Sequence, residues 1–124
     1  MTMTNLDLTD RHILLVEDDY MLARALISLV EMWGATILGP AATTERALAL
    51  LAQTERVDVA VIDVNLRGET SYALADALIA RSVPYIFMTG YGASTIPERY
   101  HGATILQKPF KAAKLVEALV ALIG

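Results

Sequence analysis

The stretch VDVAVIDVNLRGE, residues 57–69, decides the fold of this chain. Its first half is an apolar run rich in β-branched side chains, a pattern typical of a strand that is covered on both faces in the middle of a parallel sheet. The run ends at Asp63, and residues 64–69 favour a loop. Because open α/β sheets bind their ligands at the carboxyl ends of the strands, Asp63 is the first candidate functional residue.

Length and composition favour one globular domain. Of the 124 residues, 55% are hydrophobic and 19% are charged, proportions that exclude a disordered or highly charged tail protein. The sequence has no membrane-length apolar run, no signal-peptide pattern and no cysteine, so we expect a cytoplasmic protein without membrane contact. The net charge of −4 argues against direct binding of nucleic acid. We expect residues 1–10 to be a frayed polar lead-in and residues 11–124 to form the domain.

Apolar runs alternate with amphipathic segments on both sides of the central strand. The five predicted strands cover residues 12–16, 35–38, 57–62, 84–89 and 103–107. Helical spacing of apolar side chains predicts a helix after the first, second, third and fifth strands. The expected end residues are Gly34 after the first helix, Thr43 or Thr44 before the second, and Thr70 or Ser71 before the third. Parallel neighbours need crossover connections, so we predict an α/β fold, a doubly wound five-stranded parallel sheet with helices on both faces.

The interval between the fourth and fifth strands breaks this rhythm. Residues 90–102 contain three glycines and one proline, and their only large apolar side chains are Tyr91, Ile96 and Tyr100. A long amphipathic helix would have little to bury there. We therefore expect a fourth helix that is short or irregular, and more mobile than the others.

Polar side chains stand where the strands of this apolar chain end. They are Glu17 and Asp18, Asp63, Thr89 and Lys108. Carboxylates that share one crevice raise one another's pKa unless a cation neutralises them, and a hard ion with few protein ligands and several waters is typically Mg²⁺. A lysine and a hydroxyl can hold an anionic group on Asp63, which is sufficient equipment for phosphoryl transfer to a carboxylate.

Four short motifs carry a family resemblance over essentially the whole chain. They are HILLVEDD (residues 12–19), DVNL (63–66), MTG (88–90) and QKPF (107–110). Each is weak alone, but in this order and on successive strand ends they resemble the receiver domains of two-component response regulators. The resemblance implies a flavodoxin-like sheet of strand order 2-1-3-4-5, Mg²⁺ as cofactor, and a phosphate donor that is a histidine kinase or a phosphotransfer protein.

The resemblance also implies a role for each matching residue. On the metal side, Asp18 and Asp63 would bind Mg²⁺ directly, Glu17 would act mostly through water, and Asn65 would offer its backbone carbonyl. On the phosphoryl side, the roles implied are phosphoacceptor for Asp63, hydroxyl donor to the phosphoryl oxygens for Thr89, partner of the phosphate for Lys108, and a cis peptide bond before Pro109.

The chain departs from the family pattern at three positions. Arg67 stands where proline is usual, Ser71 replaces a glycine, and Ile105 replaces the aromatic switch residue of the fifth strand. The motif FMTGYG (87–92) resembles the FAT-GUY subfamily of single-domain receivers, which are typically associated with histidine kinases of the HWE and related families. Tyr91 is therefore the candidate for a displaced switch with Thr89, and the alternative is a half-buried ring without that role.

We expect a phosphoacceptor switch whose reporting surface lies around residues 90–106 and the last helix. It is not expected to be an enzyme beyond phosphotransfer to itself and its own dephosphorylation. Because no effector domain follows Gly124, output is expected from binding another protein or from draining phosphate from a shared kinase. One alternative is a pseudo-receiver that binds partners independently of phosphate. A less favoured one is a Mg²⁺-dependent phosphatase resembling the haloacid dehalogenase family, which needs its nucleophile in a DxD motif on the first strand.

Overall fold

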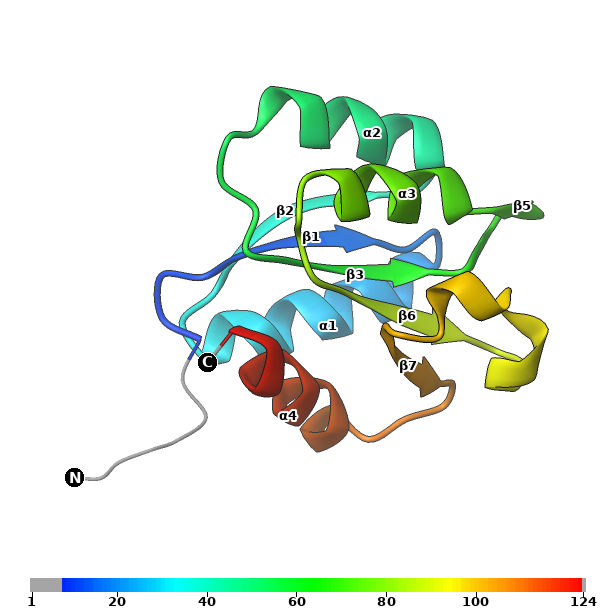
Figure 1. Cartoon of the computed structure of the whole chain (residues 1–124). Coiled ribbons are helices and arrows are strands. Elements are labelled where there is room, and N and C mark those ends of the chain that lie inside the picture. The colour runs from blue at the N-terminus through cyan, green and yellow to red at the C-terminus, as the bar shows by residue number, and fades with distance from the viewer. Residues whose placement is uncertain (1–7, 124) are drawn as a thin grey trace.

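A five-stranded parallel sheet forms the centre of the molecule, seen in the computed structural model in Figure 1. The structure describes residues 8–123. The sheet order is β2 (Thr36–Ala41), β1 (His12–Val16), β3 (Val59–Asp63), β6 (Tyr85–Thr89) and β7 (Thr104–Gln107). All neighbouring pairs are parallel, which confirms the predicted doubly wound sheet and the order 2-1-3-4-5 of its five strands.

Helices cover both faces of the sheet. Helices α2 (Thr44–Gln53) and α3 (Tyr72–Ala80) lie on one face, and α1 (Tyr20–Met32) and α4 (Ala112–Ile123) lie on the other (Figure 1). Two hydrophobic clusters fill the spaces between sheet and helices. Every side chain of β3 is buried, which explains why its sequence is apolar without alternation. Within the described part of the chain, no helix has the length and hydropathy needed to cross a bilayer.

Side chains cap the first turns of two helices. Asp19 accepts a hydrogen bond from the amide of Leu22 (3.1 Å) and begins α1. Thr43, rather than Thr44, accepts one from the amide of Arg46 (3.1 Å) and begins α2. Ser71 precedes α3, but its hydroxyl makes no cap hydrogen bond. That hydroxyl is used elsewhere, at the end of β3.

The expectation that the lead-in is frayed is wrong at Leu8. Leu8 is fully buried, and its amide donates to the carbonyl of Trp33 at 2.9 Å. Gly34, which follows α1 with φ +93°, lets the backbone of Thr9 approach, because a Cβ there would lie 2.9 Å from the Thr9 Cα. The backbone of residues 8–10 therefore lies against the end of α1. The remainder of the lead-in lies outside the described residues.

The second strand is longer than predicted. Its pattern weakens after Leu38, but β2 continues through Gly39 and Pro40 to Ala41. The strand lies at the edge of the sheet, where a proline amide is not needed for a ladder bond. A register shift opposite Leu14–Val16 accommodates one extra residue of β2.

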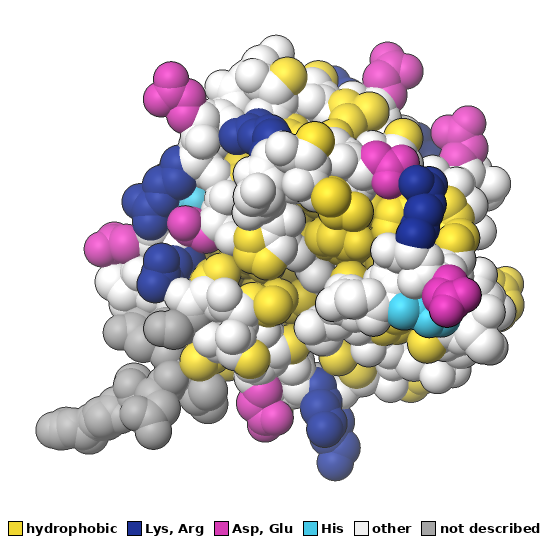
Figure 2. Space-filling view, viewed as in Figure 1, with side chains coloured by type: hydrophobic (Ala, Val, Ile, Leu, Met, Phe, Trp, Pro, Cys, Tyr) yellow, Lys and Arg dark blue, Asp and Glu magenta, His cyan; other side chains and the backbone are white. Residues whose placement is uncertain are grey.

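The connections after β3 and β6 differ in regularity. Residues 64–71 contain a two-stranded antiparallel hairpin, β4 (Asn65–Leu66) with β5 (Glu69–Thr70), where we predicted only a loop. Residues 90–103 contain two single 3-10 turns, η1 (Ala93–Thr95) and η2 (Glu98–Tyr100). The short, irregular fourth helix is thus confirmed. On the face shown in Figure 2, charged side chains of both signs are scattered among hydrophobic ones.

Candidate functional site

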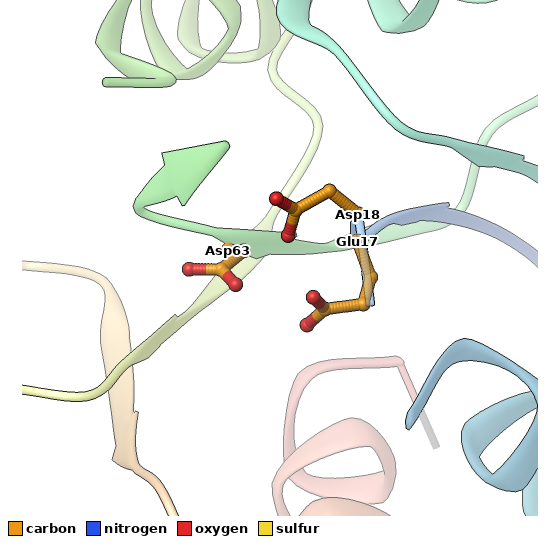
Figure 3. Close-up of side chains that lie close together, drawn as sticks. All are labelled: Glu17, Asp18 and Asp63. Atoms are coloured by element: carbon orange, nitrogen blue, oxygen red, sulfur yellow. The ribbon is translucent and has the colours of Figure 1, made fainter. Parts of the chain in front are cut away.

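Three carboxylates meet at the carboxyl edge of the central strands. Glu17 and Asp18 follow β1, and Asp63 is the last residue of β3. One oxygen from each lies within 4.8 Å of the others, and Figure 3 shows the three side chains converging. Glu17 and Asp63 are buried, whereas Asp18 is partly exposed. Adjacent parallel strands place these acids together, as the sequence predicts.

A single lysine joins two of these acids. Lys108 follows β7, and its Nζ donates to Asp63 Oδ2 at 2.7 Å and to Glu17 Oε1 at 2.9 Å. Its backbone amide donates to the carbonyl of Thr89 at 2.7 Å. The peptide bond between Lys108 and Pro109 is cis, as the family resemblance implies.

The pocket raises the pKa of two of its groups, Glu17 and Lys108. Burial raises the pKa of Glu17, and the charge of Asp63 adds to the rise, although hydrogen bonds from Lys108 and the Asp19 amide oppose it. Burial lowers the pKa of Lys108, but hydrogen bonds to Asp63 and Glu17 outweigh burial and leave that pKa raised. The lysine is therefore held as a cation between the two buried acids.

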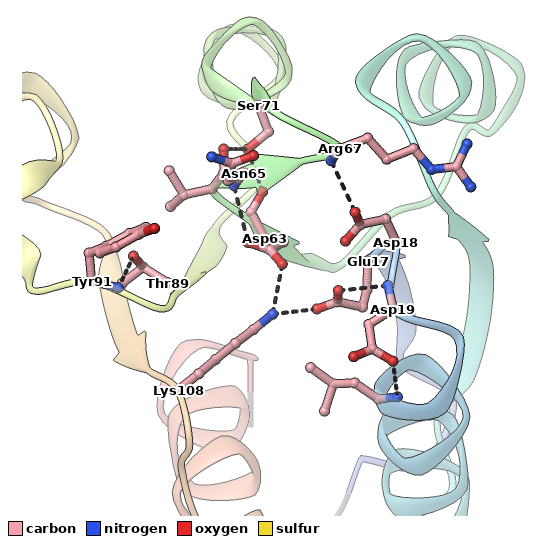
Figure 4. A network of polar contacts seen from close by, with 12 residues as sticks. Glu17, Asp18, Asp19, Asp63, Asn65, Arg67, Ser71, Thr89, Tyr91 and Lys108 are labelled. Atoms are coloured by element: carbon pink, nitrogen blue, oxygen red, sulfur yellow. Dashed lines mark hydrogen bonds and ion pairs between the residues drawn. The ribbon is translucent and has the colours of Figure 1, made fainter.

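Thr89 and Tyr91 lie beside the acids on the β6 side (Figure 4). The Thr89 side chain is buried at the end of β6, and its Oγ1 accepts a hydrogen bond from the amide of Tyr91 at 3.0 Å. The Tyr91 side chain is 68% exposed, so it is not the half-buried ring that was the alternative. Ile105, in place of the usual aromatic, packs partly buried against the cluster under α2 and α3.

The hairpin after β3 holds the other side of the pocket. The Asn65 amide donates to Asp63 Oδ1 (3.1 Å), while the Arg67 amide donates to Asp18 Oδ2 (3.0 Å). The Ser71 hydroxyl is fully buried and donates to the backbone carbonyl of Asp63 at 2.6 Å. Sequence reasoning assigned no role to Arg67 or Ser71 here. The signal that could have found both is their departure from the family pattern.

The structure brings the predicted site residues into one contact network (Figure 4). Glu17, Asp63, Asn65 and Lys108 are joined by hydrogen bonds, Asp18 lies against the first two, and Thr89 is linked through the Lys108 backbone. Tyr91 lies outside the pocket. The three carboxylates fit Mg²⁺, because carboxylate oxygens are ligands that Mg²⁺ prefers. Within the described residues, the one lysine bonded to them is Lys108.

This edge of the sheet has the features of a pocket that accepts a phosphoryl group on a carboxylate. The family model for the response regulator receiver domain matches residues 13–120 of the chain. The phyllosphere-induced regulator PhyR of Methylorubrum extorquens is 32% identical over 106 residues, a match that covers 83% of this chain and 40% of PhyR. The chain thus spans well under half of that relative.

Two solved structures of SdrG are similar to this chain over most of its length. SdrG from Sphingomonas melonis Fr1 has 36% identity and a TM-score of 0.80, and the match covers 98% of this chain and 100% of SdrG. A BeF3-activated conformation of SdrG, from Pseudomonas melonis Fr1, has 37% identity and a TM-score of 0.74, covering 88% of this chain and 95% of that one.

The chain belongs to the family of response regulator receiver domains. It is a phosphoacceptor switch of two-component signalling. Receiver domains are in general signalling phosphoacceptors rather than enzymes. They bind Mg²⁺ at an acidic pocket, and they interact with histidine kinases or phosphotransfer proteins.

Proposed function

We propose that Asp63 accepts the phosphoryl group from a phosphohistidine of a histidine kinase or phosphotransfer protein. A carboxylate oxygen of Asp63 attacks phosphorus, the P–N bond breaks, and its electron pair stays on the imidazole of the donor. The observation that carries this proposal is the position of the Asp63 carboxyl group, at the strand end with its Oδ2 2.7 Å from the Lys108 Nζ. Glu17 shares the lysine and the neighbouring carboxyl groups, but Asp63 is the acid that ends the central strand β3 and also accepts the Asn65 amide at 3.1 Å.

The neighbouring groups would hold the cofactor and the transferred group. Asp18 and Asp63 are the proposed direct ligands of Mg²⁺, with the backbone carbonyl of Asn65, and Glu17 acts mostly through water. When bound, the ion supplies positive charge that offsets the charge of the phosphoryl oxygens. Lys108 pairs with the phosphate, and the Thr89 hydroxyl donates to a phosphoryl oxygen, which its present role as acceptor leaves it free to do.

Thr89 is also the proposed start of the conformational switch. Its Oγ1 is bonded to the Tyr91 amide, so a shift of Thr89 towards Asp63 pulls directly on the next loop. Gly90 and Gly92 flank Tyr91, and glycine permits the backbone change that such a shift requires. The expected result is an altered surface over residues 90–106 and α4.

The partner proposed is a kinase of the HWE or related type, on the resemblance of residues 87–92 to the FAT-GUY motif. The protein would act in the cytoplasm, either by binding a target protein when phosphorylated or as a phosphate sink for a shared kinase. Activation of SdrG by BeF3 supports a response of the same kind here, because the match to SdrG spans most of both chains.

The deciding experiment treats the whole chain with acetyl phosphate in the presence of Mg²⁺ or EDTA. Intact-mass measurement is expected to show one phosphoryl group per chain with Mg²⁺, and none in EDTA or in Asp63→Asn. Glu117→Gln, which removes an exposed acid from α4, is the matched control and should label normally. Catalytic turnover without a stable adduct would favour the phosphatase, and no adduct of any kind would favour the pseudo-receiver.

A further inference from the structure

We propose that the backbone amide of Arg67, at the tip of the β4–β5 hairpin, is a positioning group that aims Asp18 at the metal site. This inference rests on the proposed function, since it concerns how the chain prepares its Mg²⁺ ligands. The Arg67 amide donates to Asp18 Oδ2 at 3.0 Å, across 49 residues of sequence. In Figure 4 the amide faces Asp18, while the guanidinium extends away from it.

Asp18 is the carboxylate of the three that this backbone amide holds. Within the described residues, the Lys108 ammonium bonds to Glu17 and Asp63 but not to Asp18. Asp18 is also the one acid of the three that is partly exposed. Without a fixed partner its side chain would sample several rotamers, and binding a metal would have to select one of them. The Arg67 amide binds Oδ2 and leaves Oδ1 free.

The hairpin fixes the position of this amide. Arg67 and Gly68 have φ angles of +52° and +86°, the left-handed pair that a two-residue turn of this kind requires. The Gly68 amide donates to Asn65 Oδ1 at 3.0 Å, which closes the turn from inside. Leu66 is buried and anchors the β4 strand to the core. The amide is thus held by the backbone, independently of the arginine side chain.

Substitutions at position 67 therefore distinguish a role of the backbone amide from a role of the arginine side chain. Proline has no amide hydrogen and fixes φ near −65°, so it can neither donate to Asp18 nor adopt the observed turn. Glycine keeps the amide and adopts a positive φ readily, but it has no side chain. If the backbone amide positions Asp18, proline weakens Mg²⁺ binding and glycine does not. If the arginine side chain matters instead, both substitutions act alike.

The test is calorimetric titration of the whole chain with MgCl2. We expect Arg67→Gly to bind Mg²⁺ within about twofold of the unsubstituted protein, and Arg67→Pro to bind about tenfold more weakly, the effect of one charge-assisted hydrogen bond. At saturating Mg²⁺, the acetyl phosphate labelling rate of Arg67→Pro should return to near that of Arg67→Gly, because the lost contact acts on metal binding. Equal Mg²⁺ affinity in the two variants overturns the inference.

A second variant keeps the test decisive if Arg67→Pro fails to fold. Asn65→Ala removes the side-chain acceptor of the Gly68 amide but leaves the backbone of residue 65 and the Arg67 amide in place. We expect faster hydrogen exchange at the Arg67 amide together with weaker Mg²⁺ binding. Faster exchange with undiminished Mg²⁺ affinity overturns the inference. Failure of the unsubstituted protein to bind Mg²⁺ at all would instead refute the proposed function.

Discussion

The loops that follow β3 and β6 lie next to each other at the site, yet they are built in opposite ways. Residues 64–71 are tied to the pocket by backbone amides and a buried hydroxyl, with bonds to Asp18 and to both the side chain and the carbonyl of Asp63. Residues 90–95 are all exposed except Gly92, which is partly exposed. The proposed metal side of the pocket is therefore held by several hydrogen bonds, whereas most of the proposed reporting side is exposed to solvent.

The second loop is anchored again at η2, a few residues after its exposed start. Tyr100 is 1% exposed, stacks on Tyr72 with ring centroids 4.9 Å apart, and meets Phe87 edge-on at 5.8 Å. Its hydroxyl donates to Asp76 Oδ1 at 2.8 Å. Burial, with the hydrogen bond to Asp76, raises the pKa of Tyr100 to about 12, so the hydroxyl stays protonated and remains a donor. Arg99 covers the ring 4.5 Å from its centroid.

The strongest test of this division is removal of the anchor. Tyr100→Ala deletes a fully buried aromatic side chain and is expected to lower the free energy of unfolding by about 3 to 5 kcal/mol. Tyr91→Ala removes an equally large but exposed ring and should change it by less than about 0.5 kcal/mol. Urea unfolding followed by circular dichroism measures both. Equal losses in the two variants would mean that η2 is not the anchor.

Sequence patterns predicted the sheet and the position of the acids because those features depend on local signals. The apolar run of β3 reports burial on both faces, and strand order in a parallel sheet then brings the strand ends at Val16 and Asp63 together. The absence of a long helix from residues 90–102 was likewise visible, since glycine and proline leave little amphipathic pattern there.

What the sequence could not predict depends on contacts between distant residues. The docking of Leu8 needs the carbonyl of Trp33 at the far end of α1. The β4–β5 hairpin has Arg-Gly at its turn, a weaker signal than Asn-Gly, and is fixed partly by Asp18. Ser71 was predicted as a possible cap because its type suits one, but tertiary structure directs its hydroxyl to the end of β3.

A more moderate effect should follow from cutting one bond of the preformed loop. Ser71→Ala leaves the carbonyl of Asp63 without this buried donor and is expected to lower the free energy of unfolding by about 1 to 2 kcal/mol. Ser94→Ala, in the exposed turn η1, is the matched control and should be neutral. Denaturant unfolding gives the energies, and faster hydrogen exchange should be confined to residues 64–71. A Ser71→Ala protein as stable as the control would show that this bond does not hold the loop.

The smallest and most informative effect concerns the exposed ring itself. Because the Tyr91 amide, rather than its ring, bonds to Thr89, Tyr91→Ala should still take up phosphate on Asp63 at a rate within about twofold of the unsubstituted protein. If the ring moves inward with Thr89, its loss exposes the acyl phosphate to water. Its lifetime should then shorten severalfold, and the change in hydrogen exchange over residues 90–102 on phosphorylation should shrink.

Tyr91→Phe separates the ring from its hydroxyl in the same measurements. Retention of both the lifetime and the exchange response in this variant would assign the switch to the bulk of the ring, which alone can screen the phosphate from water. Loss of both would assign it to a hydrogen bond of the hydroxyl. If Tyr91→Ala leaves lifetime and response unchanged, Tyr91 is not the switch, and the movement of Thr89 must reach the surface by way of β7, whose Lys108 amide is bonded to the Thr89 carbonyl.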